Sequence, residues 1–268
     1  MKKKKGLGFY LRIYRKILAQ DIKSKMSYRA DFIISTLGMI FTNIAGFVSF
    51  WIIFQNFPSI NGWDFNEMLF LYGFSLVSIT PVQCFFDNNW SLRMYVYNGD
   101  FIKYCFRPVN LFFYFQSEVF DIKGLGQLAF GIGTIACAWS RLEIGFSALM
   151  LLKLIVYLIT ASLVMIALQN AAAATCFWIQ NSFIVLDLVN KIKDYAKYPI
   201  TIFGSVFRFV FTFVFPIAFI AYYPSLVILR PDEVPILSWL SPLVGALFFF
   251  LSYKFWMYGA LKYNGTGA

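Results

Sequence analysis

The chain has 268 residues, of which 60% are hydrophobic and 13% are charged, and its mean hydropathy is +0.67. Because a soluble domain carries roughly a quarter charged residues, this composition excludes a large soluble domain and predicts an all-α polytopic membrane protein. The formal net charge of +10 does not indicate a nucleic-acid partner, since the basic residues flank hydrophobic stretches, where they set the topology and contact anionic membrane lipids.

Residues 1–31 are strongly basic. Ten of the 23 Lys and Arg residues lie in the first 29 positions, directly before an apolar stretch, and this order predicts a cytoplasmic N-terminus. From Phe9 onward basic and apolar residues alternate, which predicts an interfacial helix with its basic side chains toward lipid headgroups. A disordered basic tail fits only Lys2 to Lys5. The apolar stretch begins too late and is too long for a cleavable signal peptide.

Residues 32–262 are predicted to form a six-helix transmembrane domain with both termini in the cytoplasm. The first crossing, 32–55, would be about 36 Å long at 1.5 Å per residue, which is enough to span a bilayer with some tilt. The basic loop 87–109 and the tail 263–268 would then face the cytoplasm. The predicted crossings are 32–55, 67–86, 122–139, 144–170, 200–222 and 239–260.

The stretch between the fourth and fifth crossings allows two topologies. In the first, a crossing at 144–170 is followed by an interfacial helix over 176–196. In the second, an extra crossing places Lys191, Lys193 and Lys197 outside the cell. The first is favoured because several polar residues make 170–190 unfavourable as a lipid-exposed span. It leaves only Arg141 and Arg230 outside, with 18 of the 23 basic residues inside.

The residue inventory contains no sign of catalytic or metal chemistry. Histidine is absent and the four cysteines are scattered, so neither metal-ligand spacing nor a Cys-x-x-Cys motif occurs. No G-x-x-x-x-G-K-[ST] phosphate loop is present, and the chain is therefore not expected to hydrolyse ATP through that motif or to bind a cofactor itself. The cysteines are Cys84, Cys105, Cys137 and Cys176.

The loop 87–109 contains the most informative polar segment. Gly99 and Asp100 suit the start of a short helix, with Asp100 as its N-cap, and Pro108 would end that helix after about two turns. The helix would display Phe101, Tyr104 and Phe106, with Lys103 toward the cytoplasm. Such a surface suits a docking site for a soluble partner, and an ordinary lipid-facing interfacial helix is the alternative.

Two residues of the predicted fifth crossing stand out. A charge at the membrane centre costs a few kcal/mol on insertion scales, so Arg208 needs a partner or access to the interface. In the functional interpretation, it pairs with Glu118 or Asp121 and links the cytoplasmic loop to this helix. In the structural interpretation, it snorkels or makes a static pair. Pro216 frees a backbone carbonyl and permits a kink or a re-entrant turn.

Several short motifs, in this order on a six-crossing frame, resemble type 2 ABC exporter permeases. Arg107-Pro108-Val109-Asn110 is similar to the end of the coupling segment of that family. The branch that it resembles, which includes viologen exporters, is indicated by Tyr198-Pro199-Ile200, Pro216, Pro224 and the terminal Tyr263-Asn264-Gly265-Thr266-Gly267.

The resemblance implies partners and roles. Two permeases, identical or siblings, would form a dimer and bind two separate ATPase subunits, which hold the ATP and Mg²⁺. The segment 216–235 would fold back at the outer face and help to gate release. Coupling to the ATPase would involve Gly99, Asp100, Phe101, Lys103, Arg107 and Pro108.

The leading hypothesis is therefore a permease subunit of an ABC exporter in the plasma membrane. Its substrate would be an amphipathic, hydrophobic or cationic compound or a lipid, leaving through a dimer interface lined by the first, second and fifth crossings. The alternative is a membrane scaffold or assembly subunit with no transport pathway. A membrane enzyme is least favoured, because no nucleophile–base pair appears.

Overall fold

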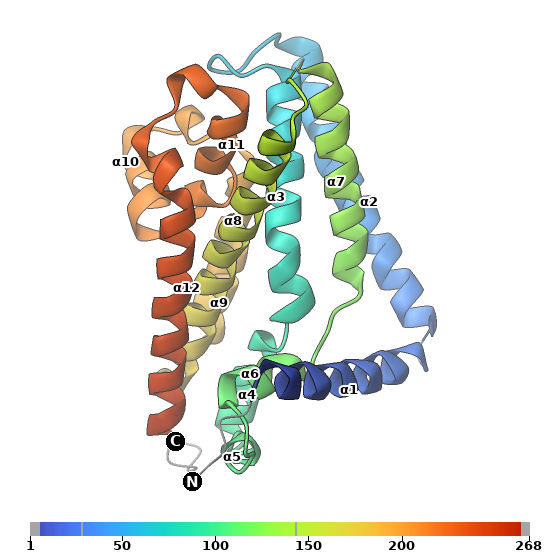
Figure 1. Cartoon of the computed structure of the whole chain (residues 1–268), viewed down its shortest axis with the longest axis vertical. Coiled ribbons are helices and arrows are strands. Elements are labelled where there is room, and N and C mark those ends of the chain that lie inside the picture. Colours follow the sequence, from blue (N-terminus) through green and yellow to red (C-terminus); the bar gives the residue numbers. More distant parts are fainter. Residues whose placement is uncertain (1–5, 28, 143, 264–268) are drawn as a thin grey trace.

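The computed structural model describes residues 6–27, 29–142 and 144–263, and all regular structure in these ranges is helical. Five long helices run alongside one another, and α1 lies across one end (Figure 1). The predictions made for Lys2 to Lys5 and for the tail after Tyr263 lie outside the described residues. The long helices are α2 (Arg29–Asn56), α3 (Phe65–Phe85), α7 (Lys123–Arg141), α8 (Ala148–Ala174) and α12 (Ile236–Lys262).

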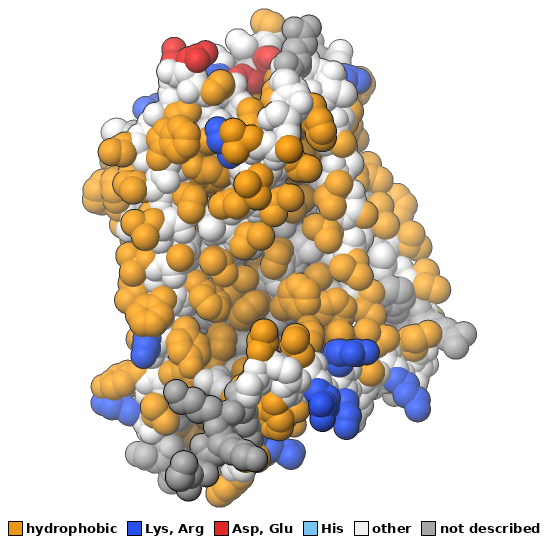
Figure 2. All heavy atoms as spheres, viewed as in Figure 1, with side chains coloured by type: hydrophobic (Ala, Val, Ile, Leu, Met, Phe, Trp, Pro, Cys, Tyr) orange, Lys and Arg blue, Asp and Glu red, His pale blue; other side chains and the backbone are white. Residues whose placement is uncertain are grey.

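The two ends of this bundle differ. The lower end in Figure 1 carries α1 (Leu7–Met26), α4 (Asn89–Tyr97), α5 (Ile102–Cys105) and α6 (Leu111–Ser117). The upper end carries the loop 57–64 and the short helices α10 (Ser205–Phe209) and α11 (Tyr222–Leu229). On the face shown in Figure 2, Lys and Arg side chains gather at the lower end, beneath a broad hydrophobic band, and acidic side chains at the upper end.

Within the described residues, four helices are long and apolar enough to cross a membrane: Ile33–Asn56, Phe65–Tyr97, Ala148–Phe177 and Ile236–Lys262. A fifth candidate is the pair Ser205–Val214 and Ile217–Leu229, which is bent by 74°. The chain is thus a multi-pass membrane protein. α7, which is richer in glycine, is not among these candidates although it lies along α3, so the count of six crossings stays a prediction.

Local sequence signals set where the helices begin. α3 starts with a capping box, in which Asp64 accepts from the Glu67 N–H and Glu67 accepts from the Asp64 N–H. α8 begins after Ser147, whose hydroxyl oxygen accepts from the Met150 N–H. These caps satisfy backbone donors that would otherwise be unpaired at a helix end.

Small residues allow the long helices to approach closely. A Cβ added to Gly73 on α3 would lie 2.9 Å from Ile135 of α7, and one added to Gly131 on α7 would lie 2.9 Å from Val77 of α3. α8 and α12 also approach closely at Gly245, where a Cβ would lie 2.2 Å from the Thr160 carbonyl oxygen. Close backbone approach at small residues is how membrane helices gain packing energy without a hydrophobic driving force.

α1 contains no buried residue and packs against the lower end of the bundle. The Tyr10 ring meets the Phe113 ring edge-on at 4.9 Å, and the Lys25 ammonium donates to the Phe120 carbonyl at 2.6 Å. α1 is thus held by α6 and by the segment that follows it, and its position at a membrane interface stays a prediction.

The path between α8 and α12 differs from the favoured prediction. At the lower end, Arg93 Nε donates to the Gln180 carbonyl at 2.9 Å. At the upper end, Asn61 Nδ2 donates to the Thr201 carbonyl at 2.7 Å and Trp63 Nε1 to the Thr201 hydroxyl at 3.1 Å. Residues 180–201 therefore pass from one end of the molecule to the other, and an interfacial helix over 176–196 is wrong.

This passage consists of α9 (Phe183–Ile192) and the 3₁₀ helix η2 (Lys193–Lys197). It corresponds to the extra crossing that the sequence left as the alternative, although its lysines lie along the passage instead of outside. Leu186, Val189 and Ala196 are buried against the bundle. Of the polar residues that disfavoured a lipid-exposed span, Gln169 and Asn170 are buried within α8, and Asp187 pairs with Lys191.

The predicted fifth crossing, 200–222, is also wrong. Thr201 and Arg230 both contact the loop 61–67 at the upper end, because Arg230 Nη2 donates to the Gly62 carbonyl at 2.7 Å and Arg230 Nε to Glu67 at 3.0 Å. Residues 201–230 thus begin and end on the same side. They form a re-entrant segment, and α9 and η2 connect the two ends of the molecule before it.

Candidate functional site

The predicted coupling segment forms a compact turn at the lower end of the molecule. α4 ends at Tyr97 with Asn98 as its C-cap, and Gly99 follows with φ of +81°, a left-handed conformation that favours glycine. α5 is a single turn, Ile102–Cys105, and Asp100 lies in the turn before it while Phe101 occupies the N-cap position. The prediction of a two-turn helix capped by Asp100 is therefore wrong, because the bend at Gly99 shortens it.

Phe101 and Tyr104 do not face a partner. Both are buried, with 0% and 1% of their surfaces exposed. The Phe101 ring lies 5.2 to 6.2 Å from five other aromatic rings, an arrangement that anchors α5 to α6, to the end of α8 and to α12. The five rings belong to Tyr104, Phe115, Phe177, Trp256 and Tyr263.

The remaining predicted coupling residues form the outer face of the same turn. Asp100, Lys103, Arg107 and Pro108 are exposed, and Phe106 exposes 80% of its surface. Lys103 Nζ lies 4.2 Å from the centroid of the Tyr95 ring, and the Arg107 guanidinium 5.4 Å from that of Tyr114. These cation–π contacts orient both basic groups on the surface. We call residues 100, 103, 106, 107 and 108 the coupling face.

Glu118 lies beside this turn, Asp121 lies beside the end of α3, where its N–H donates to the Cys84 carbonyl at 3.0 Å, and neither lies near Arg208. The Tyr104 hydroxyl donates to Glu118 Oε2, and burial followed by this hydrogen bond raises the pKa of the Tyr104 phenol. Asp121 Oδ1 accepts from the Lys123 N–H at 3.1 Å.

Arg208 instead donates to the carbonyls of Thr201, at 2.6 Å, and Phe203, at 2.9 Å, at the upper end. Pairing of Arg208 with Glu118 or Asp121 is thus wrong, because the chain enters the re-entrant segment from the upper end. The position of Arg208 matches the alternative interpretation, in which its side chain makes a static contact.

A buried amide cluster links the lower elements to α8, and the sequence analysis did not identify it. Asn89 Nδ2 on α4 donates to Asn170 Oδ1 on α8 at 2.7 Å, and Gln116 Nε2 on α6 donates to Asn89 Oδ1 at 2.8 Å. All three side chains are buried. The sequence signal that could have indicated this cluster is the presence of amide side chains at the ends of apolar stretches, because such groups need internal hydrogen-bond partners when they are buried.

Pro216 lies at the bend of the re-entrant segment. A π-helical turn, Val210–Val214, precedes it, and the chain turns by 74° before continuing into α11. α11 is wedged into the bundle, with Tyr222 to Ile228 all buried. A simple kink followed by a surface loop, one of the two interpretations of Pro216, does not describe this segment.

An ion pair closes the upper end of the re-entrant segment. Arg230 Nε and Nη2 each lie 3.0 Å from one oxygen of Glu67, and the guanidinium lies 4.2 Å from the centroid of the Trp63 ring. This bidentate pair joins the end of α11 to the start of α3. The sequence could not pair these residues, which are 163 positions apart.

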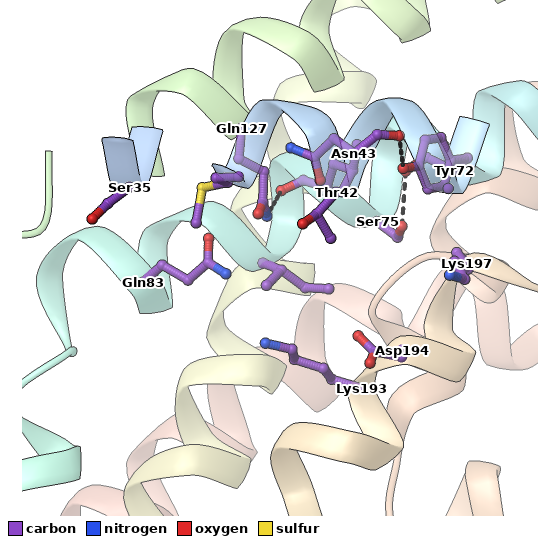
Figure 3. Close-up of a pocket in the computed structure, with 14 residues that line it drawn as sticks. Ser35, Thr42, Asn43, Tyr72, Ser75, Gln83, Gln127, Lys193, Asp194 and Lys197 are labelled. Carbon is purple, nitrogen blue, oxygen red and sulfur yellow. Dashed lines mark hydrogen bonds between the residues drawn. The ribbon is translucent and has the colours of Figure 1, made fainter. Parts of the chain in front are cut away.

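A polar cavity of about 470 Å³ lies between α2, α3, α7 and η2. Figure 3 shows side chains from α2 and α3 on one side of it and the lysines of η2 on the other. Its polar lining residues are Ser35, Thr42, Asn43, Tyr72, Ser75, Gln83, Gln127, Lys193, Asp194 and Lys197.

The charges of this cavity come from one segment, η2. Lys193, Asp194 and Lys197 line it, and none of the three takes part in an ion pair in the part of the chain that the structure describes. Among those residues, the ion pairs are Lys25–Asp21, Lys191–Asp187 and Arg230–Glu67.

Within residues 6–27, 29–142 and 144–263, no group of three Cys, Asp or Glu side chains is placed to hold a metal ion. Cys84 and Cys176 are buried, and Cys105 and Cys137 are exposed; all four are free thiols. At the coupling face and in the polar cavity, these residues support binding of a partner or ligand and the transmission of movement.

Comparison with known proteins gives one finding. A family model described as "ABC-2 family transporter protein" matches residues 37–267. The match covers every long helix described above from the first third of α2 onward. No curated protein and no solved structure matches the chain.

Proposed function

The chain belongs to the ABC-2 family of transporter proteins, and on this basis we propose that it is the membrane-spanning permease subunit of an ABC exporter. The resemblance to type 2 ABC permeases is confirmed, while the viologen-exporter branch stays a prediction. Members of this family form the transmembrane component, not the nucleotide-binding one, and generally work with ABC ATPase partners. Membership over residues 37–267 is the observation that carries the proposal.

The coupling face receives the movement of the ATPase in this proposal. A separate ATPase, which holds the ATP and Mg²⁺, docks on Phe106, Lys103 and Arg107 from the cytoplasm. Phe101 and Tyr104 act behind that surface. The Phe101 ring joins this turn to α12 and to the end of α8, and the Tyr104 ring packs on Phe101 and on α6. The amide cluster of Asn89, Gln116 and Asn170 supplies a second rigid connection into α8.

The passage for the substrate begins at the polar cavity. Its walls come from α2, α3, α7 and η2, and a second permease, identical or a sibling, completes the passage across the exposed side of α2. The re-entrant segment 201–230 gates the upper end, where Arg230 and Glu67 hold it closed. The substrate is an amphipathic, hydrophobic or cationic compound or a lipid, exported across the plasma membrane.

The cavity also separates transport from the alternative of a membrane scaffold. Polar and charged groups are costly within a hydrophobic band, and they commonly mark substrate pathways there. A scaffold subunit needs no such cavity, whereas a permease does. This observation favours transport.

The test is isolation of the full-length chain from its native membrane with any bound ATPase. We expect an ABC ATPase to co-purify with the chain. Phe106→Ala and Asp100→Lys should each weaken its retention, or its stimulation by the permease, about fivefold or more, because truncating a central interface residue costs about 1 kcal/mol or more.

The matched control is Phe146→Ala. Phe146 exposes 79% of its surface, compared with 80% for Phe106, but lies in the loop between α7 and α8 at the other end of the molecule. It should retain the ATPase as the unmodified chain does. Equal effects of the Phe106 and Phe146 variants, or no ATPase in the preparation, would argue against the coupling role.

A further inference from the structure

We propose that the polar cavity binds the anionic headgroup of an amphiphile, a carboxylate or a phosphate ester, and that Lys193 is its main cationic contact. This inference rests on the proposed function, since it names the class of substrate that the permease takes. It narrows the expected substrates from amphipathic, cationic and lipid compounds to anionic, lipid-like ones.

Lys193 is placed where an ammonium group needs a partner. It lies on η2, about halfway along the passage between the two ends, and its side chain lines the cavity (Figure 3). No ion pair of Lys193 occurs among the described residues. A charge at membrane depth is costly unless it is paired or faces water or a ligand, so an anion in the cavity would stabilise this arrangement.

The balance of charge in the cavity is positive. Lys193 and Lys197 line it together with a single carboxylate, Asp194. The other polar lining residues are neutral hydroxyls and amides. With two cations against one anion, the cavity attracts negative groups and repels cationic ones.

The neutral lining supplies a further donor. Asn43 is buried, with 6% of its surface exposed, and its Nδ2 has no hydrogen-bond partner within the described part of the chain. Tyr72, Ser75 and Gln127 already donate to backbone carbonyls, which leaves Asn43 Nδ2 free for a ligand. An unpaired buried donor costs free energy, and an anionic oxygen is a strong acceptor that would satisfy it.

The position of the cavity favours an amphiphile over a small inorganic anion. Met39, Leu76 and Ile79 line the cavity beside its polar groups. These apolar side chains can contact the start of an acyl chain while the headgroup occupies the polar part of the cavity.

The experiment measures binding of radiolabelled dodecanoate and dodecyl phosphate to the full-length chain in phosphatidylcholine nanodiscs, with empty nanodiscs as the background. We expect saturable binding of both probes. Excess dodecyltrimethylammonium and excess inorganic phosphate should not displace them. Displacement by inorganic phosphate at similar concentrations would show a site for a free anion, and displacement by the cationic amphiphile would show that charge is not recognised. Either result would overturn the proposal.

Variants test the role of Lys193. Lys193→Gln should weaken binding at least about tenfold, because it removes a charge-assisted contact, and Lys193→Arg should keep it. Asp194→Asn should strengthen binding. The matched control is Lys153→Gln on α8, since Lys153 lies beside Trp239 and does not line the cavity. Unchanged affinity of the Lys193→Gln variant would refute the assignment.

Two further readouts keep the outcomes separate. Monodisperse elution of each variant shows that it is folded. If the Lys193→Gln variant does not elute as a monodisperse peak, the affinity of the Asp194→Asn variant for the probes, compared with that of the unmodified chain, tests the proposal. A Lys193→Gln variant that dissociates an oligomer would instead assign Lys193 to a contact between two copies and overturn the proposal. Because binding requires no ATPase, its failure is independent of the coupling experiment.

Discussion

Phe101 and Phe106 are five positions apart and have opposite environments. Phe101 is fully buried among aromatic rings, while Phe106 exposes 80% of its surface. The sequence predicted both on one docking surface, because a short helix between Gly99 and Pro108 could display either. The left-handed turn at Gly99 and the single turn of α5 rotate Phe101 inward, so the two rings serve different purposes.

The first prediction follows from this difference. Phe101→Ala should lower the free energy of unfolding by about 3–5 kcal/mol, because it leaves a cavity within the aromatic cluster. Phe106→Ala should change it by less than about 0.5 kcal/mol, as is usual for surface substitutions. Thermal loss of the monodisperse elution peak in detergent measures both. Equal thermal shifts for the two variants would contradict the assignment of Phe101 to the core.

Other residue roles were beyond the sequence. Arg208 was correctly singled out as a charge needing partners, but its partners are the carbonyls of Thr201 and Phe203, not a carboxylate. Backbone acceptors carry no residue-type signal, since every residue has one. The pairing of Arg230 with Glu67 could not be predicted either. Arg230 follows a helix and Glu67 lies in the first turn of one, and charged residues are common at both kinds of position.

At the scale of the helices, glycine controls how closely α8 and α12 approach. Gly245 is a point of close approach, where a Cβ would lie 2.2 Å from a backbone oxygen of α8. Gly133 on α7 has open space instead, with nothing within 4 Å of an added Cβ. The two glycines look equivalent in the sequence, since each interrupts an apolar helix.

The second prediction compares these positions. Gly245→Ala should destabilise the protein by about 1–3 kcal/mol, because the clash is with backbone and the two helices must separate. Gly133→Ala should be neutral or stabilise by up to about 1 kcal/mol, because alanine favours the helix. The same elution-based thermal measurement applies. A destabilised Gly133 variant beside an unaffected Gly245 variant would show that the helices pack differently.

At the scale of the whole molecule, the direction of residues 180–201 decides the architecture. With α9 and η2 passing from the lower to the upper end, α12 can return to the lower end after the re-entrant segment (Figure 1). The same passage brings the lysines of η2 opposite α2 and α3, and so creates the polar cavity. The favoured topology from the sequence would have left these lysines at the membrane surface.

The third prediction tests this passage by crosslinking. In a chain with Cys105 and Cys137 replaced by serine, a short bifunctional maleimide should join cysteines introduced at Asn61 and Thr201, because these residues are hydrogen-bonded at 2.7 Å. Cysteines at Asn61 and Gln180 should not be joined, since Gln180 is bonded to Arg93 at the lower end. Protease cleavage followed by electrophoresis shows the link. The reverse pattern would restore the interfacial helix.

The sequence by itself determined the membrane class, the family resemblance and the approximate positions of the five long helices α2, α3, α7, α8 and α12, because these follow from composition and from the pattern of apolar stretches. The tertiary structure alone decided the path of residues 176–230, the burial of Phe101, the partners of Arg208 and the polar cavity. The path, the burial of Phe101 and the cavity depend on contacts between distant segments, such as Trp63 with Thr201, 138 positions apart. The partners of Arg208 are close in sequence, but they are backbone carbonyls. Hydropathy reports how well a segment tolerates lipid, but not which protein surface covers it.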